Sequence, residues 1–179
     1  MTKRAVFLDR DGVINEVLTD RVKFVNKRED LFFLPRVPEA IQMLNESGLF
    51  DLIAVITNQG GVGLGYMKEE QLQDIHQYMV DELKKLGAVI DEVCYCPHKP
   101  KEGCDCRKPG SKMIEDIAKE HDIDLSTSYM VGDREPDIEA GQNAGTKTVF
   151  LGEDYGLANA TFPTLYDAAQ WIIQDAQKQ

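Results

Sequence analysis

Short apolar runs alternate along the chain with longer segments in which apolar residues recur every three or four positions. The short runs are typical of buried β-strands and the longer segments of amphipathic α-helices. This alternation predicts an α/β protein, a Rossmann-like three-layer sandwich built around a mainly parallel five-stranded sheet. The five strands are expected at residues 5–8, 52–57, 89–95, 129–132 and 148–151.

Five helices are predicted between and after these strands. Three of their ends carry residues common at helix ends: Gly48 after the first helix, Ser111 before the third, and Pro136 at the start of the fourth. The second helix is the longest and presents one apolar stripe. The stripe consists of Leu72, Ile75, Met79, Leu83 and Leu86. The fifth helix is expected at 165–176.

The segment 15–35 is charged and lacks clean periodicity. It is long for a connection within a compact domain, so it is either a functional flap or a small hairpin. The chain contains no internal repeat and no linker that would divide it. We therefore expect one domain over residues 1–179, without a separate cap domain.

Composition narrows the class of protein. The chain has 179 residues, of which 42% are hydrophobic and 28% charged, as in ordinary soluble domains. The formal net charge of −11 argues against nucleic acid or an anionic membrane as a partner. The chain has no apolar run near the roughly 20 residues that span a bilayer, and residues 5–8 are too short for a signal sequence. We expect a cytoplasmic monomer.

Candidate chemistry begins directly after the first predicted strand, with Asp9, Asp11 and Gly12. Open α/β sheets bind ligands at the carboxyl ends of their strands. Two aspartates separated by one residue can point to the same side of an extended backbone, and Gly12 then allows a sharp turn. One carboxylate can attack while the other moves protons. An acidic turn or a calcium-binding loop has a similar sequence.

Three further segments follow predicted strands or precede a predicted helix. Residues 57–61 combine a threonine hydroxyl with glycine amides that suit phosphate oxygens. Arg107 and Lys108 precede the helix that begins near Ser111, a position that favours an anion. Asp133 lies just after the fourth strand, where its carboxylate would suit Mg²⁺. Taken singly, each segment is also compatible with a capped turn or a solvated polar loop.

Together these segments resemble the haloacid dehalogenase-like phosphatases in order and spacing, over residues 7–151. The resemblance implies that Asp9 is the nucleophile and Asp11 the general acid and base. It also implies that Thr57 binds the transferred phosphoryl group and that Lys108 neutralises charge. The implied Mg²⁺ ligands are Asp9, the backbone carbonyl of Asp11 and Asp133, with Asp137 orienting them. The implied substrate-binding residues are Asn58, Gln59, Gly60, Arg107, Lys108 and Arg134.

Three cysteines and a histidine make a second candidate site, in a loop at 94–108. Cys96, His98, Cys104 and Cys106 match the donor set of a closed tetrahedral Zn²⁺ site. A disulfide framework would spread its cysteines more widely along the chain. Reduced, packed cysteines beside a surface histidine are the alternative. Cys94 could replace one ligand, although the resemblance implies that it is a buried free thiol. The proposed Zn²⁺ would fix the positions of Arg107 and Lys108.

Within the family, the sequence is most similar to the heptose bisphosphate and histidinol phosphate phosphatases. The runs 11–15 and 58–62 favour removal of the 7-phosphate of D-glycero-D-manno-heptose 1,7-bisphosphate. The five-residue spacing between His98 and Cys104 resembles the histidinol phosphate phosphatases, so histidinol phosphate or another small sugar phosphate is the alternative substrate. Leu64, where heptose enzymes commonly carry arginine, departs from the heptose pattern. A non-catalytic interaction protein that contains zinc is a further alternative.

Overall fold

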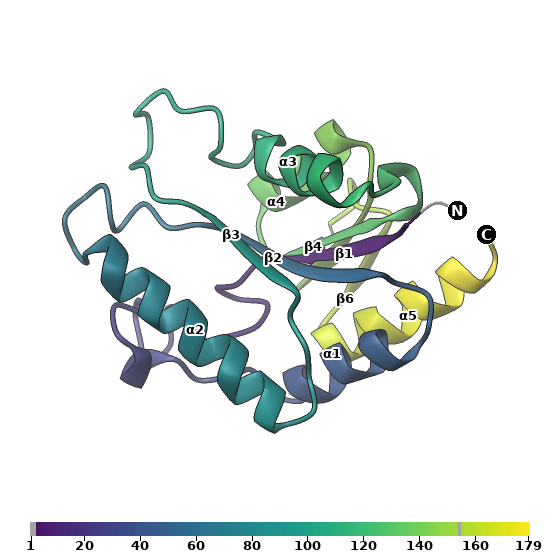
Figure 1. Ribbon diagram of the computed structural model, residues 1–179, viewed down its shortest axis with the longest axis horizontal. Helices are drawn as coiled ribbons and strands as arrows, with labels where there is room; N and C mark the ends of the chain where they lie inside the picture. The colour runs from purple at the N-terminus through teal and green to yellow at the C-terminus, as the bar shows by residue number, and fades with distance from the viewer. Residues whose placement is uncertain (1–2, 154) are drawn as a thin grey trace.

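The computed structural model describes residues 3–153 and 155–179, and its core is a sheet in which all neighbouring strands are parallel (Figure 1). The strand order is β3-β2-β1-β4-β5-β6. The strands are β1 (Ala5–Leu8), β2 (Leu52–Asn58), β3 (Glu92–Cys96), β4 (Tyr129–Gly132), β5 (Lys147–Leu151) and β6 (Ala160–Phe162). The expected three-layer α/β architecture is confirmed.

Helices cover both faces of this sheet (Figure 1). The helices are α1 (Val37–Glu46), α2 (Glu69–Lys85), α3 (Lys112–His121), α4 (Glu135–Ala144) and α5 (Leu165–Gln177). Helices α1, α2 and α5 lie on one side and α3 and α4 on the other. None of the helices in the described part of the chain combines the length and apolar character needed to cross a bilayer.

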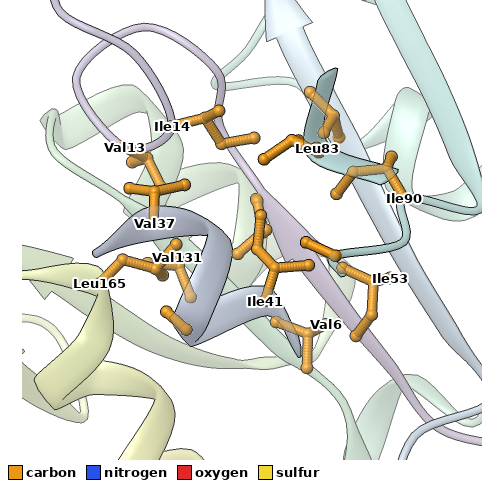
Figure 2. Packing of buried hydrophobic residues seen from close by; sticks show 14 of the residues in the cluster. Val6, Val13, Ile14, Val37, Ile41, Ile53, Leu83, Ile90, Val131 and Leu165 are labelled. Atoms are coloured by element: carbon orange, nitrogen blue, oxygen red, sulfur yellow. The ribbon is translucent and has the colours of Figure 1, made fainter. Parts of the chain in front are cut away.

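Strand β1 shows why the sheet is buried on both faces. Val6 and Leu8 join the core beneath α1, α2 and α5, whereas Ala5 and Phe7 join the core beneath α3. All four side chains are fully buried, as expected for a central parallel strand. Figure 2 shows the first of these cores, where Ile41 of α1 lies close to Val6 and Ile53.

Two expectations about the sheet were wrong. The sheet has six strands rather than five, because residues 160–162 pair in parallel with β5. This strand is only three half-buried residues long and has no apolar run that would mark it in the sequence. In addition, β3 begins at Glu92 rather than at Val89, whose backbone instead exchanges hydrogen bonds with the Asn45 side chain.

The helices agree closely with expectation, with one correction. Helix α2 ends at Lys85, so Leu86 is not part of its buried stripe and is 56% exposed. Gly87 then adopts φ +88°, a left-handed conformation that glycine tolerates without strain.

The segment 15–35 closes on itself rather than forming regular strands. Asn15 and Phe33 form an isolated antiparallel bridge at its base, and a short 3₁₀-helix spans Arg28–Asp30. Arg28 pairs with Asp74 of α2, which attaches this segment to the helix. The hairpin interpretation therefore holds only at the base of the segment.

Candidate active site

The strand order has its switch point, where open α/β sheets form their ligand-binding crevice, between β1 and β4. From β1 the chain runs outward to β2 and β3, and it then returns to β4 on the other side of β1. Ligands of open α/β sheets bind at such a switch point, outside the carboxyl ends of the strands. Asp9 follows β1 directly and Asp133 follows β4 directly, so the fold brings both carboxylates to this crevice.

Lys108 reaches the same point from the loop that follows β3. Its Nζ donates hydrogen bonds to Asp9 Oδ1 at 2.9 Å, to Asp137 Oδ1 at 2.6 Å and to the Ile56 carbonyl at 3.1 Å. The lysine is only 3% exposed. We refer to Asp9, Lys108, Asp133 and Asp137 as the carboxylate–lysine cluster.

The charges of this cluster do not balance. One carboxylate oxygen from each of the three aspartates lies within 4.8 Å of the others, while Lys108 supplies a single positive charge. Burial raises the pKa of Asp9 to about 8, with Lys108 opposing and Asp137 adding to the shift. Burial also raises the pKa of Asp133 to about 6. With all three carboxylates ionised, two negative charges would lack a partner, which fits the charge of one divalent cation.

The position of Asp133 supports the same fit. Its Oδ1 is buried and has no hydrogen-bond partner within residues 3–153 and 155–179. Hard carboxylate oxygens of this kind suit Mg²⁺. Gly12, at φ +85°, allows the close approach, because a Cβ there would lie 1.9 Å from Asp133 Oδ2. Asp137 Oδ2 accepts hydrogen bonds from the backbone N–H groups of Asp133 and Arg134, which orients the loop after β4.

The Asp11 carboxylate faces a different set of groups. Its Oδ1 accepts hydrogen bonds from Arg10 and Asn15, and its Oδ2 accepts one from Gln59 at 3.1 Å. Burial acts to raise the pKa of Asp11, but the Arg10 charge and these hydrogen bonds outweigh it and lower the pKa. Without substrate, Asp11 is therefore held as a carboxylate beside the cluster, and it must take up a proton before it can act as an acid.

Residues at the end of β2 connect Asp11 to Lys108. The buried hydroxyl of Thr57 accepts a hydrogen bond from Gln59 Nε2 at 2.9 Å. The Asn58 side chain accepts from the Lys108 backbone N–H at 2.9 Å and donates to the Lys108 carbonyl at 3.2 Å. The amide of Asn58 thus fixes the backbone from which Lys108 enters the crevice.

The predicted zinc ligands also come together. Cys96 Sγ lies 3.4 Å from His98 Nδ1 and 3.6 Å from Cys104 Sγ, and His98 Nδ1 lies 3.2 Å from Cys106 Sγ. Tetrahedral Zn²⁺ with such ligands has edges of about 3.5–3.8 Å. We refer to these four residues as the cysteine–histidine cluster. Cys94 lies outside it, half-buried, and burial raises the pKa of its thiol to about 11.

The loop that carries this cluster packs against the loop after β2. Arg107 Nη1 donates to the His98 carbonyl at 3.4 Å, and the Gly63 N–H donates to the Pro97 carbonyl at 2.9 Å. Gly60 lies against the same Arg107 Nη1, which a Cβ would approach to 3.2 Å. Arg107 is half-buried at this contact, whereas the predicted substrate ligand Arg134 is exposed.

Comparisons with known proteins agree with this geometry. A family model described as HAD-hydrolase-like, where HAD is haloacid dehalogenase, matches residues 105–158. The chain is 41% identical over 158 residues to D-glycero-β-D-manno-heptose-1,7-bisphosphate 7-phosphatase of Rhodopseudomonas palustris, covering 84% of each protein. It is 36% identical over 155 residues to the α-heptose bisphosphate phosphatase of Photorhabdus laumondii, covering 83% of this chain and 81% of that relative.

A solved structure gives the same result. The D,D-heptose 1,7-bisphosphate phosphatase from B. bronchiseptica, complexed with magnesium and phosphate, has a TM-score of 0.85 and 31% identity. The match covers 96% of this chain and 99% of that structure. The chain belongs to the haloacid dehalogenase-like phosphatase family.

In this phosphatase the crevice gathers Asp9, Asp133 and Lys108, and Asp11 with Thr57 borders it. Two polar residues near the site were missed from the sequence. Arg10 is fully buried beside Asp11, and His76 of α2 lies 3.0 Å from Arg10 Nη1. An arginine directly between two motif aspartates was the only available signal, because His76 comes near it only in the folded chain.

Proposed function

We propose that this phosphatase hydrolyses phosphomonoesters through an aspartyl-phosphate on Asp9, with Mg²⁺ bound by Asp9, Asp133 and the backbone carbonyl of Asp11. The observation that carries this proposal is the buried Lys108 Nζ, held between Asp9 and Asp137 in a cluster where three carboxylates share this one cation. Bound Mg²⁺ would neutralise these charges and those of the substrate phosphate.

Asp9 is the nucleophile in the first step. Lys108 occupies Asp9 Oδ1, which leaves Oδ2 to attack phosphorus. The bond between phosphorus and the ester oxygen breaks, and Asp11, in its protonated form, donates a proton to the departing alkoxide. Lys108 and the Thr57 hydroxyl stabilise charge on the transferred phosphoryl group, the main requirement in phosphoryl transfer.

Hydrolysis of the acyl phosphate completes the cycle. Asp11, now a carboxylate, takes a proton from water as the water oxygen attacks phosphorus. Inorganic phosphate leaves, Asp9 is again a free carboxylate, and Asp11 again carries its proton. Asn58, Gln59, Gly60, Arg107 and Arg134 would contact the rest of the substrate.

The cysteine–histidine cluster would hold Zn²⁺ in a structural role. Its donor set and its interatomic distances fit a closed tetrahedral site without an open position for water. Lys108 follows Cys106 by two residues. Bound Zn²⁺ would therefore hold the segment that carries Arg107 and Lys108. The whole chain would form a single domain without a separate cap.

The proposed substrate is D-glycero-D-manno-heptose 1,7-bisphosphate, from which the enzyme removes the 7-phosphate. Support comes from the relatives, whose names include both the β and the α forms of this substrate. The five residues between His98 and Cys104 favour histidinol phosphate as the second candidate.

A substrate panel with magnesium tests the proposal. The panel contains the α- and β-heptose bisphosphates and histidinol phosphate, with phosphate release and zinc content measured on one sample. We expect the highest kcat/KM for a heptose bisphosphate. A higher kcat/KM for histidinol phosphate would replace the substrate assignment. Absence of hydrolysis of all three would contradict the phosphomonoesterase proposal and favour a zinc-containing interaction protein.

A further inference from the structure

Arg10, between the two motif aspartates, has a side chain with no exposed surface. Its Nε and Nη2 donate to Asp11 Oδ1 at 3.0 Å and 2.8 Å. Its Nη1 lies 3.0 Å from Nε2 of His76, which is itself 5% exposed. The guanidinium therefore connects the carboxylate of Asp11 to a histidine from the middle of α2.

The chemistry of this contact fixes the state of His76. A guanidinium has donors and no acceptor, so His76 Nε2 must accept and the ring proton must lie on Nδ1. Burial, followed by the Arg10 charge, lowers the pKa of His76 to about 3, which keeps the ring neutral. Nδ1 is buried with no hydrogen-bond partner in the described part of the chain. The contact with Arg10 is thus the polar interaction of the His76 ring. An apolar side chain would fill the same buried position without burying polar nitrogens, so packing alone does not account for a histidine here.

The same network distinguishes the two oxygens of Asp11. Oδ1 receives hydrogen bonds from Arg10 and, at 3.0 Å, from Asn15. Oδ2 receives one, from Gln59. Because Oδ1 already accepts hydrogen bonds from both Arg10 and Asn15, the proton that Asp11 donates and takes up in the proposed reaction is carried by Oδ2.

We propose that His76 and Arg10 are positioning residues that lock the Asp11 carboxylate so that its Oδ2 faces the leaving oxygen. This inference rests on the proposed function, in which Asp11 is the general acid. Removing the acceptor at position 76 leaves Arg10 Nη1 buried and unpaired, so the guanidinium shifts and Asp11 Oδ1 loses its two Arg10 donors and keeps only Asn15.

The test uses the dependence of the rate on the leaving group. An alkoxide leaving group needs a proton from Asp11, whereas p-nitrophenolate leaves without one. The parameter compared is kcat/KM, because it reports only steps through the first phosphoryl transfer. The substrates are p-nitrophenyl phosphate and the panel compound that the wild type hydrolyses fastest, which is an alkyl phosphate in every case.

We expect His76→Leu to lower kcat/KM for the alkyl phosphate by about 10- to 100-fold, within the usual contribution of a general acid. For p-nitrophenyl phosphate the change should stay below about threefold, because no proton donor is needed. His76→Gln, whose side-chain carbonyl can accept from Arg10, should restore both substrates to within about threefold of the wild type.

Met79→Ala is the matched control, because it truncates a fully buried side chain on the same helix outside the network. It should leave the ratio of the two kcat/KM values unchanged. Equal losses on both substrates in His76→Leu, or no loss on either, would overturn the inference. A wild type that hydrolyses p-nitrophenyl phosphate but none of the alkyl phosphates would contradict Asp11 as the acid and the inference with it.

A measurement without substitution covers the case in which His76→Leu does not fold. Nitrogen-15 chemical shifts of the wild-type histidines identify which ring nitrogen carries the proton. We expect a neutral ring with the proton on Nδ1 of His76. A proton on Nε2 would overturn the inference whatever the activity, because Arg10 would then have no acceptor there.

Discussion

The carboxylate–lysine cluster and the cysteine–histidine cluster are assembled in different ways. The first draws its members from the ends of β1 and β4, from helix α4 and from the loop after β3. The second lies entirely within residues 96–106. Of the first cluster, three members are buried, whereas only Cys96 is buried in the second.

This difference determines what holds each cluster in place. The carboxylates are held by the packed sheet, so we expect their geometry to depend little on a bound cation. A half-exposed loop of soft ligands has little packing to order it, and in such a loop the binding free energy of the metal is folding free energy. Lys108 belongs to the first cluster by its side chain and to the loop of the second by its backbone, so it is the point where the two depend on each other.

The largest expected effect comes from removing the nucleophile. Asp9→Asn replaces the attacking carboxylate by an amide, so hydrolysis should fall by at least about 10⁴-fold, as for other nucleophile deletions. The thermal unfolding midpoint should not fall, because a buried carboxylate in an electronegative cluster is removed. Asp116→Asn, on the exposed face of α3, is the control and should keep full activity. Retained hydrolysis by Asp9→Asn would contradict the assignment of the nucleophile.

A smaller loss is expected for Lys108→Met, which removes the cation inside the carboxylate–lysine cluster. We expect kcat/KM to fall by about 10²- to 10³-fold, as when one charge-stabilising donor is lost. Without magnesium, the free energy of unfolding should fall by about 3–5 kcal/mol, because Asp9 and Asp137 lose their buried partner.

Lys112→Met is the matched control for this change, since Lys112 forms an exposed pair with Asp116 at 2.9 Å. It should leave stability nearly unchanged, because an exposed ion pair contributes little. Chemical denaturation with and without magnesium, beside a steady-state assay, measures both effects. A Lys108→Met variant as active and as stable as Lys112→Met would show that the cluster does not need its internal cation.

Removing zinc tests how far the second cluster controls the first. Cys104→Ser should lose zinc and lower kcat/KM by about 10- to 100-fold, the usual scale for disturbed metal-site support, because Lys108 is no longer held by its loop. Cys94→Ser is the matched control: Cys94 precedes Cys96 on the same strand but lies outside the cluster. It should keep its zinc and its activity. Full activity of zinc-free Cys104→Ser would show that the carboxylate–lysine cluster does not depend on zinc. Loss of zinc from Cys94→Ser would show that Cys94 is also a zinc ligand.

The two clusters also differ in how visible they are in the sequence. Cys96, His98, Cys104 and Cys106 are close together in the chain, so spacing alone predicted their proximity. The carboxylate–lysine cluster spans positions 9–137, and its prediction needed the rule that parallel strands present their carboxyl ends at one edge. Aspartates directly after two predicted strands were enough, with that rule, to predict that they meet.

What the sequence did not predict depends on tertiary context. Strand β6 has only three residues, and it is recognisable as a strand only because it pairs with β5. His76 sits beside Ile75 on the buried side of α2, where nothing in the helical pattern shows that a buried arginine will face it. The contact joins positions 66 residues apart, so neither local propensity nor periodicity carries it.

Near neutral pH the smallest expected effect is the one that His76 has on stability, and this effect grows as the pH is lowered. Its pKa is about 3 in the folded protein against 6.5 for an unperturbed histidine. Between these values the unfolded chain binds a proton that the folded chain does not, so stability falls as pH falls from about 7 toward 3. The slope from one such group approaches about 1.4 kcal/mol per pH unit.

His76→Gln keeps an acceptor for Arg10 but does not titrate, so the wild type should lose stability relative to this variant as the pH is lowered. Denaturant unfolding of both proteins from pH 7 to pH 4 measures this difference, in which the contribution of the proposed zinc ligands cancels. Parallel curves would mean that His76 takes up its proton at the same pH in the folded and the unfolded chain. Below that pH the charged ring could not accept from Arg10, which would then have to pair elsewhere.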